Sequence, residues 1–180
     1  MKGLDAIAVK GFGKTWRSVK LLMKTSFPKE ELVPLWLLRI MEKRRGVSFF
    51  AFYDSGVFVG TAYLVSFKSF LFVFYLAVSP SVREMGYGSR ILSWIREYSR
   101  GKNIALDVEA LGRGDNGTKL RRIEFYRRAG IVDTGYRLWD NGVKYMILSS
   151  SPEAFSPAVF EDGWRRFLFG CFTDHLFREE

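Results

Sequence analysis

The chain has 180 residues, a length that suits one domain with a sizeable core. Its 48% hydrophobic and 17% aromatic residues exclude a disordered chain, and the longest apolar runs are too short to span a bilayer, so we expect no membrane association. The formal net charge of +9 suits either an anionic partner or a solvated basic surface. Because no aromatic and basic RNA-binding signature stands out, we do not expect nucleic acid as the partner.

Few residues are available for metal or histidine chemistry. Cys171 is the only cysteine and His175 the only histidine, which excludes an internal disulfide and a cysteine-based zinc site. A histidine-rich metal site and a histidine-centred triad are equally disfavoured. The N-terminus lacks the long apolar core of a signal peptide. We therefore expect a cytoplasmic protein whose chemistry requires no metal.

The N-terminal half predicts a short strand, two helices and a three-stranded meander. Apolar residues recur at helical spacing in residues 14–25 and again in residues 30–43, where Pro34 is early enough to be tolerated in a first turn. The strands are expected over residues 6–9, 47–53, 57–67 and 70–78.

The last of these strands leads through a turn into a helix. Residues 70–78 form a continuous apolar run rich in aromatic and β-branched side chains, which is typical of a strand buried on both faces. Pro80 cannot continue the ladder and ends the strand. Residues 91–100 then show the apolar spacing of an amphipathic helix. The sequence therefore predicts a strand–turn–helix unit over residues 70–100.

The turn of this unit carries Arg83, Gly86 and Gly88, a pattern that suits phosphate binding. The first turn of a helix leaves backbone N–H groups unpaired and has partial positive charge. Glycines let an anion approach these groups closely, and an arginine adds a fixed cation. Paired glycines alone more often just make a turn, but the buried strand before them and the helix after them favour a pyrophosphate site.

The C-terminal half alternates strands and helices. A helix is expected over residues 118–129, with Gly130 as its C-terminal stop, after a loop over residues 112–117. A tight turn at residues 140–142 joins the last two strands. The strands are expected over residues 104–111, 131–139 and 143–148.

The end of the chain forms an aromatic extension. We divide the chain into a domain of residues 1–150 and an extension of residues 151–180, in which residues 155–178 predict a helix that Gly163 weakens in isolation. The apolar stripe of this helix is too large to leave in water, so we expect it to pack on the domain or in a homodimer contact. The stripe consists of Phe160, Trp164, Phe167, Leu168 and Cys171.

The strand–turn–helix unit resembles motif A of the GNAT superfamily of N-acetyltransferases, written V-x-P-x-x-R-x-x-G-x-G-x-x-L. The order of predicted elements over residues 7–148 is similar to that family as well. The resemblance implies a mixed α/β fold with a central, mostly antiparallel twisted sheet of about seven strands flanked by helices, here followed by the helical extension. The motif positions are occupied, in order, by Val78, Pro80, Arg83, Gly86, Gly88, Ile91 and Leu92.

This resemblance implies acetyl-CoA as the co-substrate. In the family the loop binds the pyrophosphate through backbone amides, and the preceding strand splays from its neighbour and pairs its exposed backbone with the pantetheine arm. The residues assigned to acetyl-CoA in this way are Leu76, Ala77, Val78, Arg83, Glu84, Met85, Gly86, Tyr87, Gly88 and Ser89.

Residues 123–131 resemble a second family signature, N-x-x-A-x-x-x-Y-x-x-x-G-F, through Tyr126, Gly130 and Ile131. The resemblance implies that Tyr126 protonates the departing CoA thiolate. A phenol has a pKa of about 10 and stays protonated at neutral pH, as this role requires. The alternative is an aromatic residue that packs a helix on the sheet.

The sequence departs from the family pattern at several positions. Lys119 stands where the family often has asparagine, and Arg122 where it often has alanine. Phe72 occupies the position at which some members carry a glutamate base. On the next strand, Asp107 and Glu109 are two residues apart and share a face. These carboxylates could form an amine site, or they could be solvated or paired with arginines of the helices.

Together, these resemblances imply an acetyltransferase that moves the acetyl group of acetyl-CoA to a primary amine by direct transfer. The acceptor is expected to be a small-molecule or protein amine, and no motif names it. The alternative is a non-catalytic module, either an acetyl-CoA-binding sensor or an RNA-associated factor.

Overall fold

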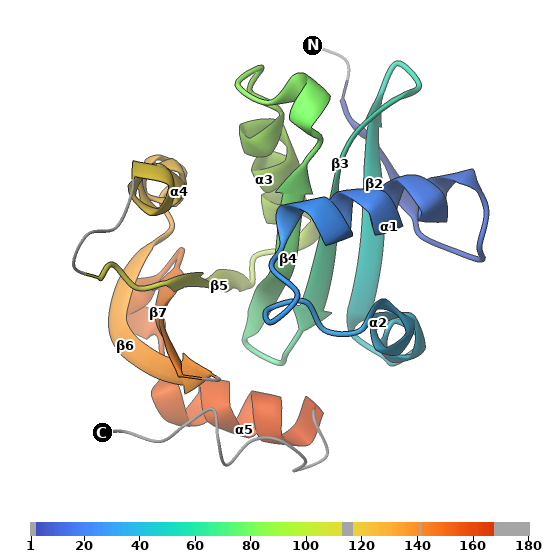
Figure 1. Cartoon of the computed structure of the whole chain (residues 1–180). Coiled ribbons are helices and arrows are strands. Elements are labelled where there is room, and N and C mark those ends of the chain that lie inside the picture. The colour runs from blue at the N-terminus through green and yellow to red at the C-terminus, as the bar shows by residue number, and fades with distance from the viewer. Residues whose placement is uncertain (1–2, 113–116, 141, 168–180) are drawn as a thin grey trace. The chain divides into compact units, whose positions relative to one another are not determined.

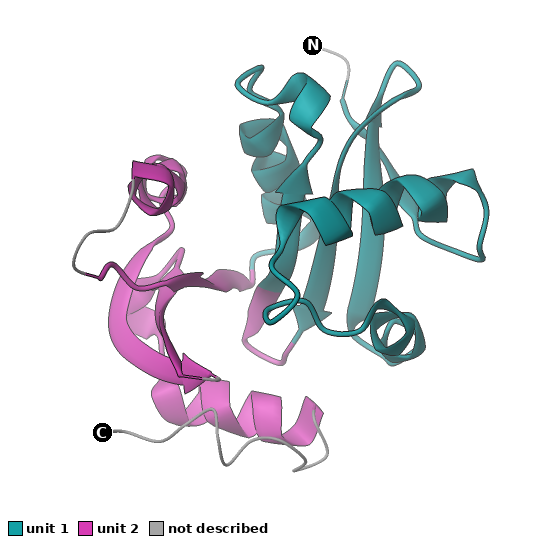
Figure 2. Cartoon of the chain, in the orientation of Figure 1, with its two compact units in different colours: residues 1–66, 73–101 teal, residues 67–72, 102–180 magenta. Residues whose placement is uncertain are grey.

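A computed structural model describes residues 3–112, 117–140 and 142–167 of the protein (Figure 1). The chain forms two compact units (Figure 2). Unit 1 contains residues 1–66 and 73–101, and unit 2 contains residues 67–72 and 102–180. The predicted division at residue 150 stays a prediction.

Unit 1 carries most of the N-terminal elements, with a short 3₁₀ turn between β4 and α3. Its elements are β1 (Asp5–Ala8), α1 (Lys14–Ser26), α2 (Leu35–Met41), β2 (Val47–Asp54), β3 (Val57–Ser66), most of β4 (Phe70–Val78) and α3 (Tyr87–Tyr98). Unit 2 begins with the first residues of β4. It continues with β5 (Asn103–Glu109), α4 (Gly117–Arg128), β6 (Val132–Asp140), β7 (Val143–Ser149) and α5 (Pro157–Phe167).

The strands form a seven-stranded sheet in the order β1-β2-β3-β4-β5-β7-β6. The pairs β1–β2, β2–β3, β5–β7 and β6–β7 are antiparallel. β4 and β5 pair in parallel, through Phe70–Phe72 and Asn103–Ala105. The mixed α/β fold with about seven strands and flanking helices, predicted from the sequence, is confirmed.

In unit 1 the helices pack on both faces of the strands. Successive side chains of a strand point to opposite faces. Phe49 of β2 meets Trp16 of α1 edge to face at 6.4 Å, whereas its neighbour Phe50 meets Trp94 of α3 at 4.8 Å. α1 and α3 therefore cover opposite faces of β2. The aromatic residues of the meander form the core between these helices.

The second helix is shorter than the sequence predicts. It begins at Leu35, not near residue 30, and Pro34 lies before the helix with extended backbone angles. A residue that precedes proline is disfavoured in the helical conformation. This residue, Val33, donates its backbone N–H to the Tyr75 hydroxyl at 3.0 Å instead. Proline therefore ends the preceding turn here and does not open a longer helix.

In unit 2, α5 packs on the first residues of β4. The Phe160 ring stacks on Phe70 with centroids 5.7 Å apart, and Trp164 meets Phe72 edge to face at 5.1 Å. Gly163 lies beneath the Phe67 ring, where a Cβ would come within 2.8 Å of Cδ1. This glycine weakens the isolated helix but permits its close packing. Phe160, Trp164 and Phe167 of the predicted stripe are buried, whereas Leu168 and Cys171 lie outside the described residues.

We predict that the aromatic contacts of α5 contribute substantially to stability. Phe160 is 1% exposed, so Phe160→Ala should lower the free energy of unfolding by about 3–5 kcal/mol in urea denaturation. Val159→Ala is the matched control, because the Val159 side chain of the same helix is 47% exposed and should contribute far less. Equal losses in the two variants would contradict the packing role of Phe160.

Candidate active site

The predicted phosphate loop is a turn between β4 and α3 in unit 1. β4 ends at Val78, and a 3₁₀ turn over Pro80–Val82 follows. Glu84 and Gly86 adopt left-handed backbone conformations, with φ of 65° and 79°. This conformation is rare for a residue with a side chain, so Glu84 marks backbone strain within the loop. Sharp turns of this kind allow the chain to reverse directly into α3.

The N-terminus of α3 is suited to anion binding. The helix begins at Tyr87, four residues before the predicted start, and Gly86 is its N-cap residue. The N-cap residue makes no side-chain hydrogen bond to the helix, and no acidic residue lies in the first turn. Gly88 therefore belongs to the first helical turn and not to the loop before it. Amide N–H groups and the helix dipole thus remain available to an anion at Gly86–Ser89.

A close contact behind β4 fixes this turn. A Cβ on Gly60 of β3 would lie 2.6 Å from the Ala77 carbonyl oxygen and 2.8 Å from Cδ1 of Ile91 in α3. The Ser79 N–H donates to the Val59 carbonyl oxygen at 2.9 Å. Gly60 therefore allows β3, the end of β4 and α3 to meet. Gly60 is not among the residues predicted for the site, although a glycine within a strand indicates a bulge or a close backbone approach.

Asp54 links the β2–β3 hairpin to the first turn of α3. Its Oδ2 accepts hydrogen bonds from Arg90 Nη1 at 2.6 Å and from the Tyr87 hydroxyl at 3.0 Å. The Arg90 guanidinium also lies over the Tyr87 ring, 4.9 Å from its centroid. The hydrogen bond from Arg90 holds the pKa of Asp54 below its ordinary value. The sequence shows Asp54 only as part of a turn, so this contact could not be predicted from local pattern.

Tyr126 lies in unit 2, on the buried face of α4. Its side chain is 8% exposed, and its carbonyl oxygen accepts a hydrogen bond from the Ile131 N–H at 3.0 Å. The pKa of Tyr126 is raised to about 12, mainly by burial; the Arg122 charge opposes this rise and the Asp107 charge adds to it. The phenol is therefore protonated at every physiological pH. Its packing role and its predicted chemical role are compatible.

The two carboxylates of β5 differ in their surroundings. Glu109 Oε1 lies 2.6 Å from the Lys119 Nζ, in an ion pair whose side chains are each about one-third exposed or less. The ion-pair partner of Glu109 is therefore a lysine of α4 and not one of the helix arginines that the sequence suggests. Lys119 is also the residue that replaces the family asparagine. Asp107 acts electrostatically on Tyr126. Glu109 is thus engaged structurally and is a poor candidate for a general base.

Among the residues that the structure describes, no helix is long and apolar enough to cross a membrane. Within the same residues, no group of three histidine, cysteine or acidic side chains is placed to hold a metal ion.

The fold is a mixed α/β arrangement, and a helix N-terminus with a glycine N-cap follows the turn after β4. The chain belongs to the GNAT family of acetyltransferases, because the model of that family matches residues 16–131. This family membership supports acetyltransferase activity. Among proteins with curated descriptions, no sequence matched this chain.

Solved structures of the family have the same fold. A protein assigned to the GNAT acetyltransferases of Bacteroides thetaiotaomicron aligns with a TM-score of 0.67 and 25% identity, over 87% of this chain and 90% of its own. The ribosomal-protein-S18-alanine N-acetyltransferase of Escherichia coli aligns with a TM-score of 0.59 and 15% identity, over 81% of this chain and 92% of its own. A GNAT acetyltransferase of Elizabethkingia anophelis with acetyl-CoA bound aligns with a TM-score of 0.57 and 12% identity, over 83% of this chain and 98% of its own.

We predict that the Asp54 contact stabilises the fold in a pH-dependent way. The pKa of Asp54 is lower in the folded protein than the value of about 3.9 expected for the unfolded chain. Its contribution is therefore present above about pH 4 and is lost as the pH falls through the folded pKa. Melting temperatures of Asp54→Asn should be lower than wild type at pH 7, and the difference should shrink below about pH 4.

Asp162→Asn provides the control for this measurement. Asp162 pairs with Arg166 on the exposed surface of α5, and exposed helical pairs contribute little. A melting-temperature difference for Asp54→Asn that stays constant from pH 7 to pH 3 would contradict the assignment.

Proposed function

We propose that the protein transfers an acetyl group from acetyl-CoA directly to a primary amine. The observation that carries this proposal is the N-terminus of α3, which begins at Tyr87 after the N-cap Gly86, has no side-chain cap and follows the turn after β4. A pyrophosphate placed there would accept hydrogen bonds from the amides of Gly86–Ser89, and Arg83 would add charge. The family membership of the chain, and the acetyl-CoA bound to one structural neighbour, support this ligand.

The remaining predicted contacts lie on the strand before the loop. Leu76, Ala77 and Val78 are the last residues of β4, and their backbone is proposed to pair with the pantetheine arm. Leu76 and Val78 are half-buried and Ala77 is buried. Pairing of this kind requires backbone groups only, so it is compatible with the apolar side chains found here. In this proposal the thioester lies near the carboxyl end of β4.

The transfer itself is a substitution at the thioester carbonyl carbon. The lone pair of the amine attacks this carbon and the N–C bond forms. The C–S bond breaks, and its electron pair leaves with sulfur. The amine nitrogen loses one proton, and CoA departs as the thiol. The products are an N-acetylated amine and CoA, and no covalent intermediate on the protein is needed.

Tyr126 is proposed to act on the departing sulfur. Because burial raises the pKa of Tyr126 to about 12, whereas a thiol has a pKa of about 8.5, complete transfer of the phenolic proton to a thiolate is unfavourable. We therefore propose that Tyr126 stabilises the developing thiolate through a hydrogen bond. The proton that finally resides on the thiol then comes from the amine.

The acceptor remains a small-molecule or protein amine. The neighbour from Escherichia coli is named for an alanine of ribosomal protein S18 as its acceptor. At 15% identity this neighbour supports the fold alone. A CoA-release screen over amino acids, polyamines, aminoglycosides and peptide N-termini would identify the class of acceptor.

A non-catalytic acetyl-CoA-binding module is the second candidate. The ion pair of Glu109 with Lys119, together with Phe72 at the position of a family glutamate, favours it because neither position supplies a free carboxylate base. CoA release above the rate of spontaneous hydrolysis with any amine would exclude this candidate. Binding of acetyl-CoA without release would support it.

We predict that Gly88→Val obstructs the pyrophosphate. Gly88 is not among the glycines with positive φ, so a side chain at this position tests ligand approach without imposing backbone strain. Isothermal calorimetry should show affinity for acetyl-CoA reduced by about tenfold or more, since each tenfold corresponds to about 1.4 kcal/mol. Arg83→Ala should weaken binding less, because the amides remain. Unchanged affinity in a folded Gly88→Val variant would contradict the assignment.

We predict that Tyr126→Phe lowers kcat by about 10- to 100-fold, the range expected for loss of one hydrogen bond to a developing charge. Affinity for acetyl-CoA should change little. Because the pKa of Tyr126 is about 12, the wild-type enzyme should show no loss of kcat from this group between pH 8 and pH 10. Full activity of the variant would leave Tyr126 with a packing role only.

A further inference from the structure

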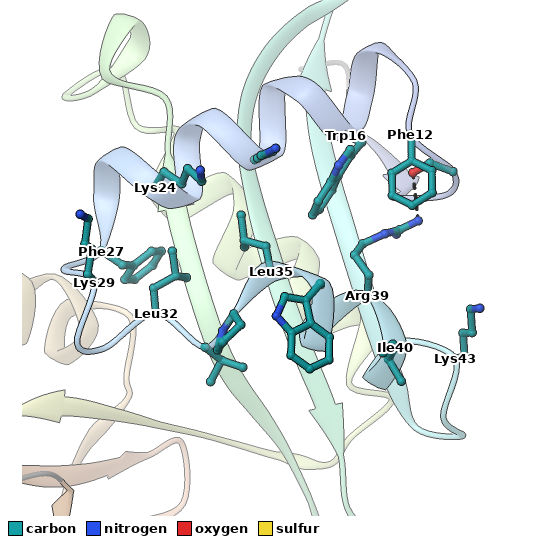
Figure 3. A pocket seen from close by; sticks show the side chains of 15 residues that line it. Phe12, Trp16, Lys24, Phe27, Lys29, Leu32, Leu35, Arg39, Ile40 and Lys43 are labelled. Atoms are coloured by element: carbon teal, nitrogen blue, oxygen red, sulfur yellow. Dashed lines mark hydrogen bonds between the residues drawn. The ribbon is translucent and has the colours of Figure 1, made fainter.

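A groove of about 1020 Å³ lies between α1 and α2 in unit 1, and we call it the α1–α2 groove (Figure 3). One stripe of α1, formed by Trp16, Lys20 and Lys24 at helical spacing, lines it together with the C-cap residue Phe27. The opposite wall comes from α2 and from the segment that precedes it. The large apolar side chains of the two walls together are those of Phe12, Trp16, Phe27, Leu32, Trp36 and Ile40.

The apolar surface of the groove is unusually open to solvent. Phe12 is 78% exposed, Trp36 66% and Ile40 55%. Large apolar side chains that gather in a concave surface indicate an interaction site. A small-molecule pocket encloses most of its ligand, whereas these three side chains of the groove are each more than half exposed. The geometry therefore favours a macromolecular partner.

The charged residues that line the groove are all cationic. Lys24 and Lys29 stand at one end and Lys43 at the other, and Lys20 also lines the wall (Figure 3). None of the described lining residues is acidic. Among the described residues, none of these four lysines forms an ion pair. The surface therefore attracts an acidic partner, with an electrostatic contribution that decreases with salt.

The fifth cation of the groove, Arg39, has a structural role. It pairs with Glu42 and donates to the carbonyl oxygens of Val9 and Gly11 at 2.6 and 3.0 Å. Its guanidinium also lies over the Trp16 ring, 5.1 Å from the centroid. These contacts hold one wall in place without using the lysines.

The other end of the groove is anchored by Tyr75 of β4. The Tyr75 hydroxyl donates to the Glu31 carbonyl oxygen at 2.8 Å and accepts from the Val33 N–H. Its ring meets Phe27 edge to face at 4.8 Å. The groove is therefore formed before any partner binds, which lowers the entropic cost of association.

The backbone of the walls determines which kind of segment fits. α1 and α2 satisfy their backbone hydrogen bonds internally, so an extended peptide would find no sheet edge to pair with. A helix satisfies its own backbone and can lay an apolar face into such a groove. A second copy of the chain in a two-fold contact would place lysine rims against each other, which is unfavourable. A flat bilayer would reach the rim but not the floor.

We propose that the α1–α2 groove is a docking site for an acidic amphipathic helix of a partner protein, with apolar anchors against Trp36 and Phe12 and carboxylates against the lysine rim. This proposal does not depend on the proposed acetyl transfer, because neither Tyr126 nor any residue assigned to acetyl-CoA binding lines the groove.

The test uses the full chain and three fluorescein-labelled synthetic helical peptides. The first has leucine and tryptophan on one face and glutamate on the flanks. The second replaces each glutamate with lysine, and the third replaces the apolar face with alanine. Fluorescence anisotropy at about 150 mM salt, where long-range charge effects are screened, should show the first binding about tenfold or more tighter than either control peptide.

Matched protein variants locate the binding. The double variant Lys24→Glu with Lys29→Glu should bind the first peptide with an affinity about tenfold or more lower than wild type. The single variant Trp36→Ala should lower this affinity by a similar factor. Lys14→Glu combined with Arg17→Glu reverses two exposed charges of α1 outside the groove, and Leu21→Ala removes an apolar side chain that is 67% exposed on the same helix. These controls should stay within about twofold.

Several results would overturn the proposal. Equal weakening by the control variants, or equal binding of the glutamate and alanine-faced peptides, would show non-specific charge attraction. Light scattering that detects a dimer lost in Trp36→Ala would assign the groove to a second copy. Binding to phosphatidylglycerol vesicles that depends on Trp36, without peptide binding, would assign it to a membrane surface.

Discussion

The approach of β3 to the end of β4 at Gly60 is the contact on which the candidate site depends. A single Cβ at this position would overlap the Ala77 carbonyl oxygen and the Ile91 side chain. Because backbone oxygen cannot move aside as a flexible side chain can, the strands and α3 would have to separate. The strand end and the helix N-terminus must lie close together for the turn between them to present its amides to one anion. A residue without a side chain therefore fixes the geometry of the loop.

Charged side chains near the candidate site have two distinct uses. Asp54 with Arg90, and Glu109 with Lys119, are short pairs that hold one element against another. Their charges are largely satisfied within the protein, which leaves the carboxylates unsuited to catalysis without rearrangement. The lysines of the α1–α2 groove are different, because they surround exposed aromatic rings without acidic neighbours in the lining. The net charge of +9 is thus concentrated in part where it can act on a partner.

Aromatic packing organises unit 2 around the first residues of β4. Phe70 and Phe72 contact Phe160 and Trp164 of α5, so this helix covers the beginning of the strand whose other end leads into the proposed phosphate loop. The same position, Phe72, carries a glutamate base in some members of the family. The replacement of a carboxylate by an aromatic ring is explained by this packing, since an unpaired charge under α5 would be strongly destabilising.

The strand–turn–helix of residues 70–100, the place of Tyr126 on a helix and the family could all be predicted from the sequence alone. These features depend on local patterns: an apolar run, glycines at fixed spacing and helical periodicity. The start of α2 at Leu35 was missed because Pro34 was placed inside a first turn, whereas tertiary contacts of Val33 hold this segment extended. The contacts of Asp54, Glu109 and Gly60 are seen only in the tertiary structure. The residues in contact are far apart in sequence, and strand register and helix packing, which no local pattern specifies, bring them together.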